Sequence, residues 1–307
     1  MFRRHLLAVM GVLLLGAFTQ ASAVGATEKI TVAYATAADF LPAFVAKDKG
    51  IFEKNGLDVT LKAIPVASVV PAALVSNSVQ IGMNTVPNIL LAAEGGIDLV
   101  AIVGAARLLK SNPRVSLVTR PGVTVTKAED LKGKKVGVPG ISSTMDIVLR
   151  KWLLNHKVPL DQVTFVEIPF PQMGDMLKAG QVDAVAAIEP LLSRIVATKS
   201  GVKSIDYFSE VTPDTLGAFW AATRDWATKH RATIDAFKKS IAEGTDWIKK
   251  NPEEARKIEV KYLGFAGKVL PAISPEMKRS DFEFFEEIGR EVGLMRKPVD
   301  VDRLIWK

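Results

Sequence analysis

Apolar and polar positions along the chain follow a pattern that repeats after about 104 residues. In the first block, apolar runs rich in β-branched residues predict strands at 29–36, 58–65 and 78–84, with helical segments between them. The matching runs of the second block are found at 134–141, 162–169 and 181–190. Because strands and helices alternate with short connections, each block predicts a mostly parallel sheet covered by helices.

Residues that favour turns and helix caps separate these elements. Gly50 and Gly180 stand where predicted helices end, whereas Asp39 and Ser143 stand where helices begin. Ser143 and Asp146 have the spacing of a capping box, in which two side chains bind the first free amides of a helix.

Two further segments indicate how the blocks are joined. The run at 114–120 leads into the second block and the run at 216–226 leads out of it, so we interpret both as strands that cross between two lobes. The chain after Asp225 predicts helices that return to the first lobe, with Pro252 and Pro275 near helix starts.

The predicted fold is therefore an α/β two-lobed clamshell, with two mixed, mostly parallel sheets, flanking helices and two hinge strands. We expect a signal peptide at 1–26, a discontinuous first lobe at 27–115 and 218–307, and a second lobe at 116–217. Ligands of open α/β sheets bind beyond the carboxyl ends of the strands. The loops expected to face the cleft are 36–40, 65–68, 84–86, 140–144, 170–172 and 188–190.

The N-terminus has the pattern of a secretory signal. Arg3 and Arg4 precede an apolar stretch of about a dozen residues, and small residues follow, so cleavage is expected after Ala23 or Ala26. The apolar stretch is too short for a confident membrane span. The chain has no cysteine, so no lipid anchor and no disulfide is expected. We expect a soluble periplasmic protein.

Charge and motifs argue against several function classes. Signal removal lowers the net charge from +7 to +5, and no Lys/Arg run exceeds two residues, so nucleic-acid binding is not expected. The chain has no cysteine, G-x-S-x-G or H-E-x-x-H motif, and His156 and His230 each stand beside a lysine. We expect no metal and no cofactor. A carboxylate pair, Asp39 and Glu189, remains open as a catalytic alternative.

The stretch from Gly140 to Thr144 is the first candidate for ligand binding. The hydroxyl groups of Ser142, Ser143 and Thr144, together with free amides at a helix N-terminus, suit an anionic or strongly polar group. The alternative is that Ser143 only caps its own helix.

Polar residues at the other strand ends are further candidates. Asp39 either contacts the ligand or caps the helix that contains Pro42. Asn84 and Thr85 follow a buried strand and suit either ligand recognition or a turn. Glu189 follows an apolar run, so its carboxylate needs a partner in a ligand or in a basic side chain.

Ser68 and three aromatic residues complete the candidate site. Phe40, Phe170 and Trp220 lie in or near the predicted cleft loops and either pack against a ligand or belong to the core. Arg107 either neutralises an anion or is a solvated loop residue.

At this point three motifs indicate a family. The segment LPAFVAKDKGIFEKNGLDVTL (41–61) resembles the A-x-x-x-G-(L/I)-F-x-x-x-G-L-D-V signature of type II periplasmic solute-binding proteins of ABC importers, in the nitrate, sulfonate and taurine group. DLKGKKVGVPG (130–140) and AGQVDAVAAIEP (179–190) resemble two further hallmarks of that group. The resemblance implies that a small solute is delivered to an ATP-driven importer. It implies binding positions at Asp39, Asn84, 142–144 and Glu189.

The leading hypothesis is a monomeric substrate-binding component of an ABC importer, with an inner-membrane permease and its ATPase as partners. It captures a small polar organic solute, sulfonate-like, taurine-like or another organic anion, by hinge closure. A ligand with both an acidic group and a hydrogen-bond donor fits the candidate residues best. Alternatives are a binder of a pyrimidine precursor of thiamine, an exported enzyme that uses Asp39 and Glu189, and a sensory module.

Overall fold

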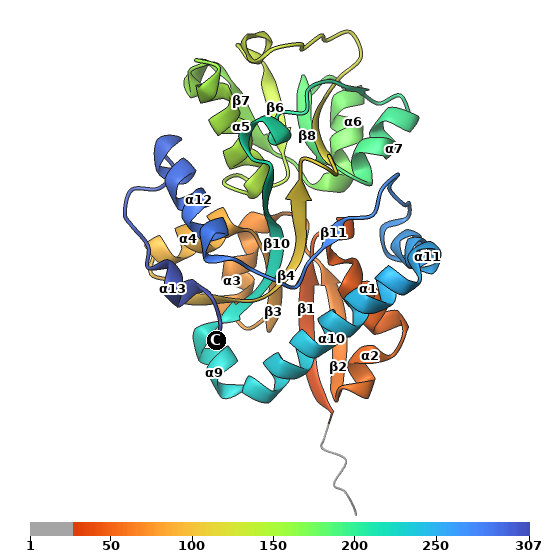
Figure 1. Ribbon diagram of the computed structural model, residues 1–307. Coiled ribbons are helices and arrows are strands. Elements are labelled where there is room, and N and C mark those ends of the chain that lie inside the picture. Colours follow the sequence, from red (N-terminus) through yellow and green to blue (C-terminus); the bar gives the residue numbers. More distant parts are fainter. Residues whose placement is uncertain (1–26) are drawn as a thin grey trace, which may run out of the picture.

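The protein consists of two lobes, each built on its own β-sheet (Figure 1). The computed structural model describes residues 27–307, so the expected signal peptide at 1–26 lies outside the described residues. The first sheet contains β1 (Glu28–Tyr34), β2 (Leu57–Ala63), β3 (Ile81–Asn84), β4 (Leu99–Leu109), β10 (Asp214–Thr223) and β11 (Ala272–Ile273). The second sheet contains β5 (Val115–Thr119), β6 (Lys135–Val138), β7 (Thr164–Glu167), β8 (Ala184–Ile188) and β9 (Val202–Lys203).

The two sheets share one strand order, which confirms the duplicated architecture. In the first sheet the neighbours run β2-β1-β3-β10, and in the second they run β7-β6-β8-β5. In each sheet the first three strands are parallel and the fourth is antiparallel to them. The predicted α/β clamshell with two mixed sheets is therefore correct, since each sheet is one copy of the repeated pattern.

Helices cover both sheets. The helices of the first lobe are α1 (Leu41–Asp48), α2 (Ile51–Lys54), α3 (Val70–Val75), α4 (Val86–Glu94), α9 (Arg224–Lys229), α10 (Arg231–Lys250), α11 (Pro252–Leu263), α12 (Arg279–Glu291) and α13 (Val301–Leu304). Those of the second are α5 (Thr144–Asn155), α6 (Met173–Lys178), α7 (Leu191–Ala197) and α8 (Phe208–Val211). Gly50 and Gly180 have positive φ after α1 and α6, as expected of helix-ending glycines.

The predicted crossing strand at 114–120 is wrong. This segment forms β5, which pairs with β8 and β9 inside the second sheet. The chain instead passes between the sheets at 110–114 and at 204–213, on either side of the long antiparallel pair formed by β4 and β10. The apolar run of β5 reflects burial within the second sheet.

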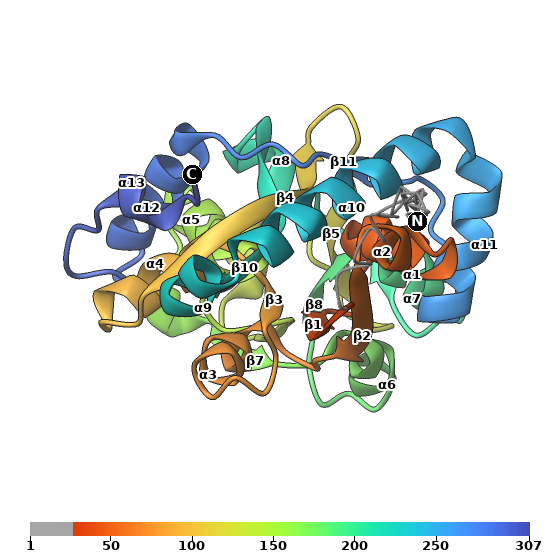
Figure 2. The ribbon, with the colours of Figure 1, turned by 90° about the horizontal axis from the view of Figure 1, so that it is seen from below.

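The C-terminal part of the chain contacts both lobes. Helix α10 packs on α1 and runs diagonally between α9 and α11 (Figure 2), whereas α12 packs against α4 of the first lobe and α5 of the second. A helix start at Pro275 was expected and is wrong. Pro275 lies before α12 in a segment without helical structure, and the Pro275 carbonyl accepts a hydrogen bond from the Gly104 amide at 2.9 Å. A Cβ on Gly104 would lie 2.5 Å from the Ser274 carbonyl oxygen, so a side chain would prevent this close approach.

Arg107 is neither a solvated loop residue nor a free anion-binding group. It lies in β4, and its guanidinium binds Asp281 of α12 through two nitrogens at 2.9 and 2.7 Å, and Asp214 of β10 at 2.5 Å. These carboxylates raise the pKa of Arg107 above its already high ordinary value. Asp281 also accepts the Leu216 amide at 3.2 Å, so this cluster ties α12 to β4 and β10.

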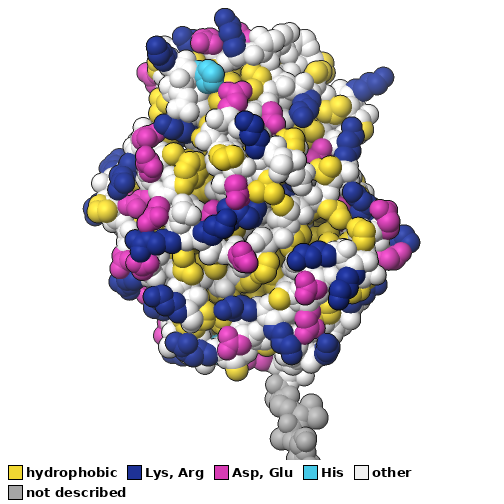
Figure 3. Space-filling view, viewed as in Figure 1, with side chains coloured by type: hydrophobic (Ala, Val, Ile, Leu, Met, Phe, Trp, Pro, Cys, Tyr) yellow, Lys and Arg dark blue, Asp and Glu magenta, His cyan; other side chains and the backbone are white. Residues whose placement is uncertain are grey.

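The surface shows no single charged field on the face in view. Basic and acidic side chains are interspersed there, with apolar groups between them (Figure 3). Among the helices described for residues 27–307, none has the length and apolar character that a membrane crossing requires.

Replacing Arg107 by Met should lower the free energy of unfolding by about 3–5 kcal/mol, because it leaves the buried Asp281 carboxylate without its charged partner. Urea unfolding followed by circular dichroism measures this change. Lys257→Met, which breaks an exposed pair with Glu254, is the control and should leave the unfolding midpoint unchanged. Equal midpoints for both variants would contradict a structural role for Arg107.

Candidate functional site

A cavity of about 70 Å³ lies between the lobes, where the strand ends of both sheets meet. This volume is several times the roughly 10–15 Å³ that one water molecule needs, so the cavity suits a small solute. Its lining comes from both lobes: Ala35, Ala37, Asp39, Phe40, Pro65, Ala67, Met83, Thr85, Leu108, Pro139, Ser143, Thr144, Met145, Phe170, Ile188, Gly217 and Ala218. Each of the six predicted cleft loops contributes to this lining.

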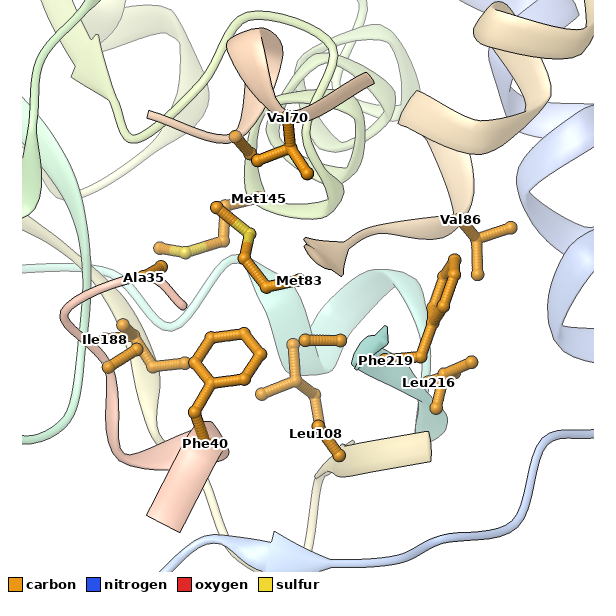
Figure 4. Close-up of a cluster of buried hydrophobic side chains, with 14 of the residues drawn as sticks. Ala35, Phe40, Val70, Met83, Val86, Leu108, Met145, Ile188, Leu216 and Phe219 are labelled. Atoms are coloured by element: carbon orange, nitrogen blue, oxygen red, sulfur yellow. The ribbon is translucent and has the colours of Figure 1, made fainter. Parts of the chain in front are cut away.

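Most of the cavity wall is apolar. Phe40, Met83 and Leu108 approach it from the first lobe, and Met145 and Ile188 approach it from the second (Figure 4). All five side chains are buried. Such a wall favours an apolar part of a ligand and leaves recognition to a few polar groups.

The predicted site residues divide into two groups. Those that line the cavity are Asp39, Phe40, Thr85, Ser143, Thr144 and Phe170. Those that lie outside its lining are Ser68, Asn84, Ser142, Glu189 and Trp220.

The N-terminus of α5 differs from the expectation of free amides at Ser142 to Thr144. The Ser142 amide donates to the Asp146 carboxylate at 2.7 Å, and the Ser143 amide donates to the Gly140 carbonyl at 3.1 Å. The amide of Ile141 donates to Glu167 at 2.8 Å. The protein itself therefore uses these amides, and the positive end of α5 meets the cavity at its first residues, Thr144 and Met145.

Two hydroxyl groups in the cavity wall have no protein partner. Ser143 occupies the N-cap position of α5, but its side chain makes no capping bond, so the predicted capping box is wrong. Within residues 27–307, the buried Ser143 Oγ and Thr85 Oγ1 find no hydrogen-bond partner. Buried polar groups are normally paired, so these two hydroxyls mark where a ligand's polar atoms fit.

Asp39 does not cap a helix. It lies within the 3₁₀ turn Ala38–Phe40, and one of its carboxylate oxygens accepts a hydrogen bond from Arg114 Nη1 at 2.8 Å. Arg114 Nη2 donates to the Glu189 carbonyl oxygen at 3.1 Å. Asp39 thus lines the cavity as half of a buried ion pair.

The Glu189 carboxylate was expected to pair with a ligand or a basic side chain, but its partner within the described chain is Ser193. Its oxygens accept the Ser193 hydroxyl at 2.8 Å and the Ser193 amide at 3.3 Å, in the first turn of α7. Because Ser193 binds the Glu189 carboxylate and Arg114 binds the Asp39 carboxylate, these two groups do not form a free pair across the cleft.

The other residues outside the cavity wall have structural contacts. Asn84 Oδ1 accepts the Thr85 amide at 2.8 Å, which positions Thr85 at the start of α4. Trp220 packs edge-to-face on Phe40 with ring centroids 5.3 Å apart and so supports the cavity from behind. The exposed Ser68 donates to Glu167 of the second lobe at 3.0 Å, so it links the lobes at their rim.

Sequence reasoning missed Arg114 and the two methionines of the cavity wall. Arg114 begins a buried apolar strand, and a charged residue at such a position signals a buried partner. Met83 and Met145 carry no comparable signal, because apolar residues of strands and helices are usually core. Among the described residues, no group of His, Asp or Glu side chains has the arrangement of a metal site.

A second buried carboxyl lies behind the ion pair. Glu259 of α11 is fully buried, and its Oε1 accepts the Gly267 amide at 3.2 Å. Burial raises the pKa of Glu259, and the charge of Asp39 acts in the same direction, while the Gly267 amide, Arg256 and Arg114 oppose them.

Comparison with known proteins now identifies the family. The sequence signature of the NMT1/THI5-like family matches residues 37–255, which is more than half of the chain. The chain belongs to the NMT1/THI5-like family. The resemblance to solute-binding proteins that the motifs indicated is therefore confirmed.

Three of the proteins that this NMT1/THI5-like chain resembles are named for the solutes they bind. The chain is 29% identical over 238 residues to the taurine-binding periplasmic protein of Escherichia coli K12, an alignment that spans 75% of this chain and 71% of that relative. Its fold matches the alkanesulfonate-binding protein SsuA of Xanthomonas axonopodis pv. citri, bound to MOPS, with a TM-score of 0.78 at 17% identity, over 91% of this chain and 98% of that one. The periplasmic nitrate-binding protein NrtA of Synechocystis PCC 6803 matches with a TM-score of 0.77 at 16% identity, over 92% and 86% of the two chains.

Glu259→Gln should change how stability depends on pH. The folded protein holds the Glu259 proton more tightly than the unfolded chain does, because burial raises the pKa of Glu259. The protonated Glu259 therefore contributes to the free energy of unfolding of the wild type, and this contribution is lost as pH rises from about 4.3, the ordinary pKa of Glu, through the raised folded-state pKa. The variant lacks this loss, so its free energy of unfolding relative to wild type should increase over that interval. Urea titrations at a series of pH values measure the difference.

Glu276→Gln, at an exposed carboxylate, is the control and should follow the wild-type profile. If Glu259→Gln also ran parallel to wild type over the whole interval, Glu259 would be ionised equally in both states and the interpretation would be wrong.

Proposed function

We propose that this protein is the substrate-binding component of an ABC importer and captures a small organic anion, sulfonate-like in character, between its two lobes in the periplasm. The supporting observation is the cavity between the lobes, to which each lobe contributes one unpartnered buried hydroxyl, Thr85 from the first and Ser143 from the second. A ligand that bonds to both hydroxyls stabilises the closed form over the open one.

Contacts across the cleft support capture by hinge closure. The Thr144 hydroxyl donates to the Gly217 carbonyl of the first lobe at 3.4 Å, and Ser68 donates to Glu167 at the rim. Arg114 binds Asp39 across the same cleft. These contacts involve few residues, so closure is reversible and a bound solute adds to it. The closed form is then the form that a membrane permease and its ATPase recognise.

The chemistry of the cavity narrows the ligand class. An oxyanion head group fits beside the Ser143 hydroxyl and the N-terminus of α5, whose dipole favours negative charge. The wall formed by Phe40, Met83 and Met145 suits a short apolar body. An ammonium group finds no free carboxylate, because Asp39 and Glu189 already have partners. An alkyl oxyanion fits these surroundings better than the doubly functional ligand expected from the sequence.

Several observations favour binding over catalysis. The carboxylate pair that an exported enzyme needs is not free, and a pyrimidine binder would lack the same carboxylates as hydrogen-bond acceptors. The named relatives are binding proteins. A monomer that presents its ligand to a transporter accounts for the two-lobed form without any reacting group.

Thr85→Val and Ser143→Ala should each weaken ligand binding about tenfold, the equivalent of one hydrogen bond to a charged group. Neither change should lower the stability of the free protein, because each removes a buried hydroxyl that has no partner. Isothermal titration with methanesulfonate, ethanesulfonate, taurine and nitrate gives the affinities, and thermal melting gives the stability.

Ser78→Ala, at an exposed loop position of the first lobe, is the matched control and should bind as wild type does. A wild-type protein that binds none of these oxyanions, or that turns one over into product, would contradict the proposed function. Mass spectrometry of the small molecule that co-purifies with the native protein provides an independent check on the ligand class.

A further inference from the structure

We propose that Arg114 determines the charge class of the ligand by neutralising Asp39 in the cavity wall. This inference rests on the proposed function, because it concerns which solutes the same cavity accepts. It assigns a specificity-determining role to a residue that lies behind the cavity wall and has no contact with the cavity of its own.

Arg114 is firmly attached to the second lobe. Its carbonyl oxygen accepts the Glu189 amide at 2.9 Å, and its Nη2 donates to the Glu189 carbonyl at 3.1 Å. These two bonds join the residue before β5 to the residue after β8, and Arg114 as a whole is 2% exposed. The position of the positive charge is therefore set by the backbone of the second lobe.

The other end of the guanidinium reaches the first lobe. Arg114 Nη1 binds Asp39 Oδ1 at 2.8 Å, and Asp39 is 4% exposed. Of the cavity-lining residues within 27–307, Asp39 carries the one ionisable side chain. The net charge presented to a ligand is thus decided by this one ion pair.

A further carboxyl group and a further arginine lie near the pair. Arg114, Asp39 and Arg256 each act electrostatically on Glu259. Arg256 donates to the carbonyl oxygens of Gly267 and Lys268 at 2.6 and 3.2 Å. Of these four groups, Asp39 is the one that borders the cavity.

Removing the charge of either partner should shift the preference between the two ligand classes, in opposite directions. Without Arg114, a buried and uncompensated Asp39 carboxylate would attract a ligand ammonium group. Without the Asp39 charge, Arg114 would have a free charge for an anion. Both effects are large because the groups are buried and poorly screened.

The test compares ethanesulfonate with taurine, which differ only in the ammonium group, on four proteins: wild type, Arg114→Met, Asp39→Asn and the double variant. Arg114→Met should shift the ratio of the two dissociation constants toward taurine by about tenfold or more, as expected for a charge-assisted hydrogen bond. Asp39→Asn should shift the ratio toward ethanesulfonate by a similar factor. The double variant should return to the wild-type ratio, because it carries neither charge.

An unchanged ratio in Asp39→Asn would overturn the inference even if Arg114→Met failed to fold. If wild type bound neither sulfonate, the proposed function would lose its support. The role of Arg114 would then be tested by measuring the thermal stabilisation that ethylammonium gives to each protein. Arg114→Met should gain a thermal stabilisation from ethylammonium that wild type and the double variant lack, and its absence would refute the role of Arg114.

Discussion

The antiparallel pairing of β4 with β10 is the constraint on which the rest of the structure depends. These strands pair from Leu99 with Thr223 to Leu109 with Asp214, so the whole second lobe is an insertion between two neighbouring strands of the first. The register shifts around Gly217, whose carbonyl then accepts the Thr144 hydroxyl from the second lobe. One strand pair thus holds the lobes together and supplies part of the cavity wall.

Polar groups of the described chain that both lack a partner and border the cavity are the candidates for ligand binding. Asp146, Glu167 and Glu189 lie near the cleft, and each is used by nearby amides or hydroxyls. Thr85 and Ser143 have buried hydroxyls with no partner within the described chain. Asn84 Nδ2 and Trp220 Nε1 also lack partners but belong to residues outside the cavity lining, so an unpaired group marks a candidate position only where it borders the cavity. Position at a strand end therefore does not define the site.

The family and the ligand are decided at different levels of the structure. The NMT1/THI5-like match covers residues 37–255, and proteins named for taurine binding and for nitrate binding both resemble this chain over most of its length. In our proposal the ligand class depends on a small set of side chains around one cavity, above all the ion pair of Asp39 and Arg114. A similar fold consequently does not by itself assign a solute.

The sequence by itself determined the two lobes, the family and the loops that face the cleft, because hydrophobic periodicity and turn residues are local signals and parallel strands place their carboxyl ends at one edge. Only the tertiary structure decided which polar residues are free. Asp39 meets a partner 75 positions away, and Arg107 meets one 174 positions away, and no local pattern specifies such pairs. The same reason explains why β5 was misplaced: an apolar run shows that a strand is buried, but long-range hydrogen bonds decide in which sheet.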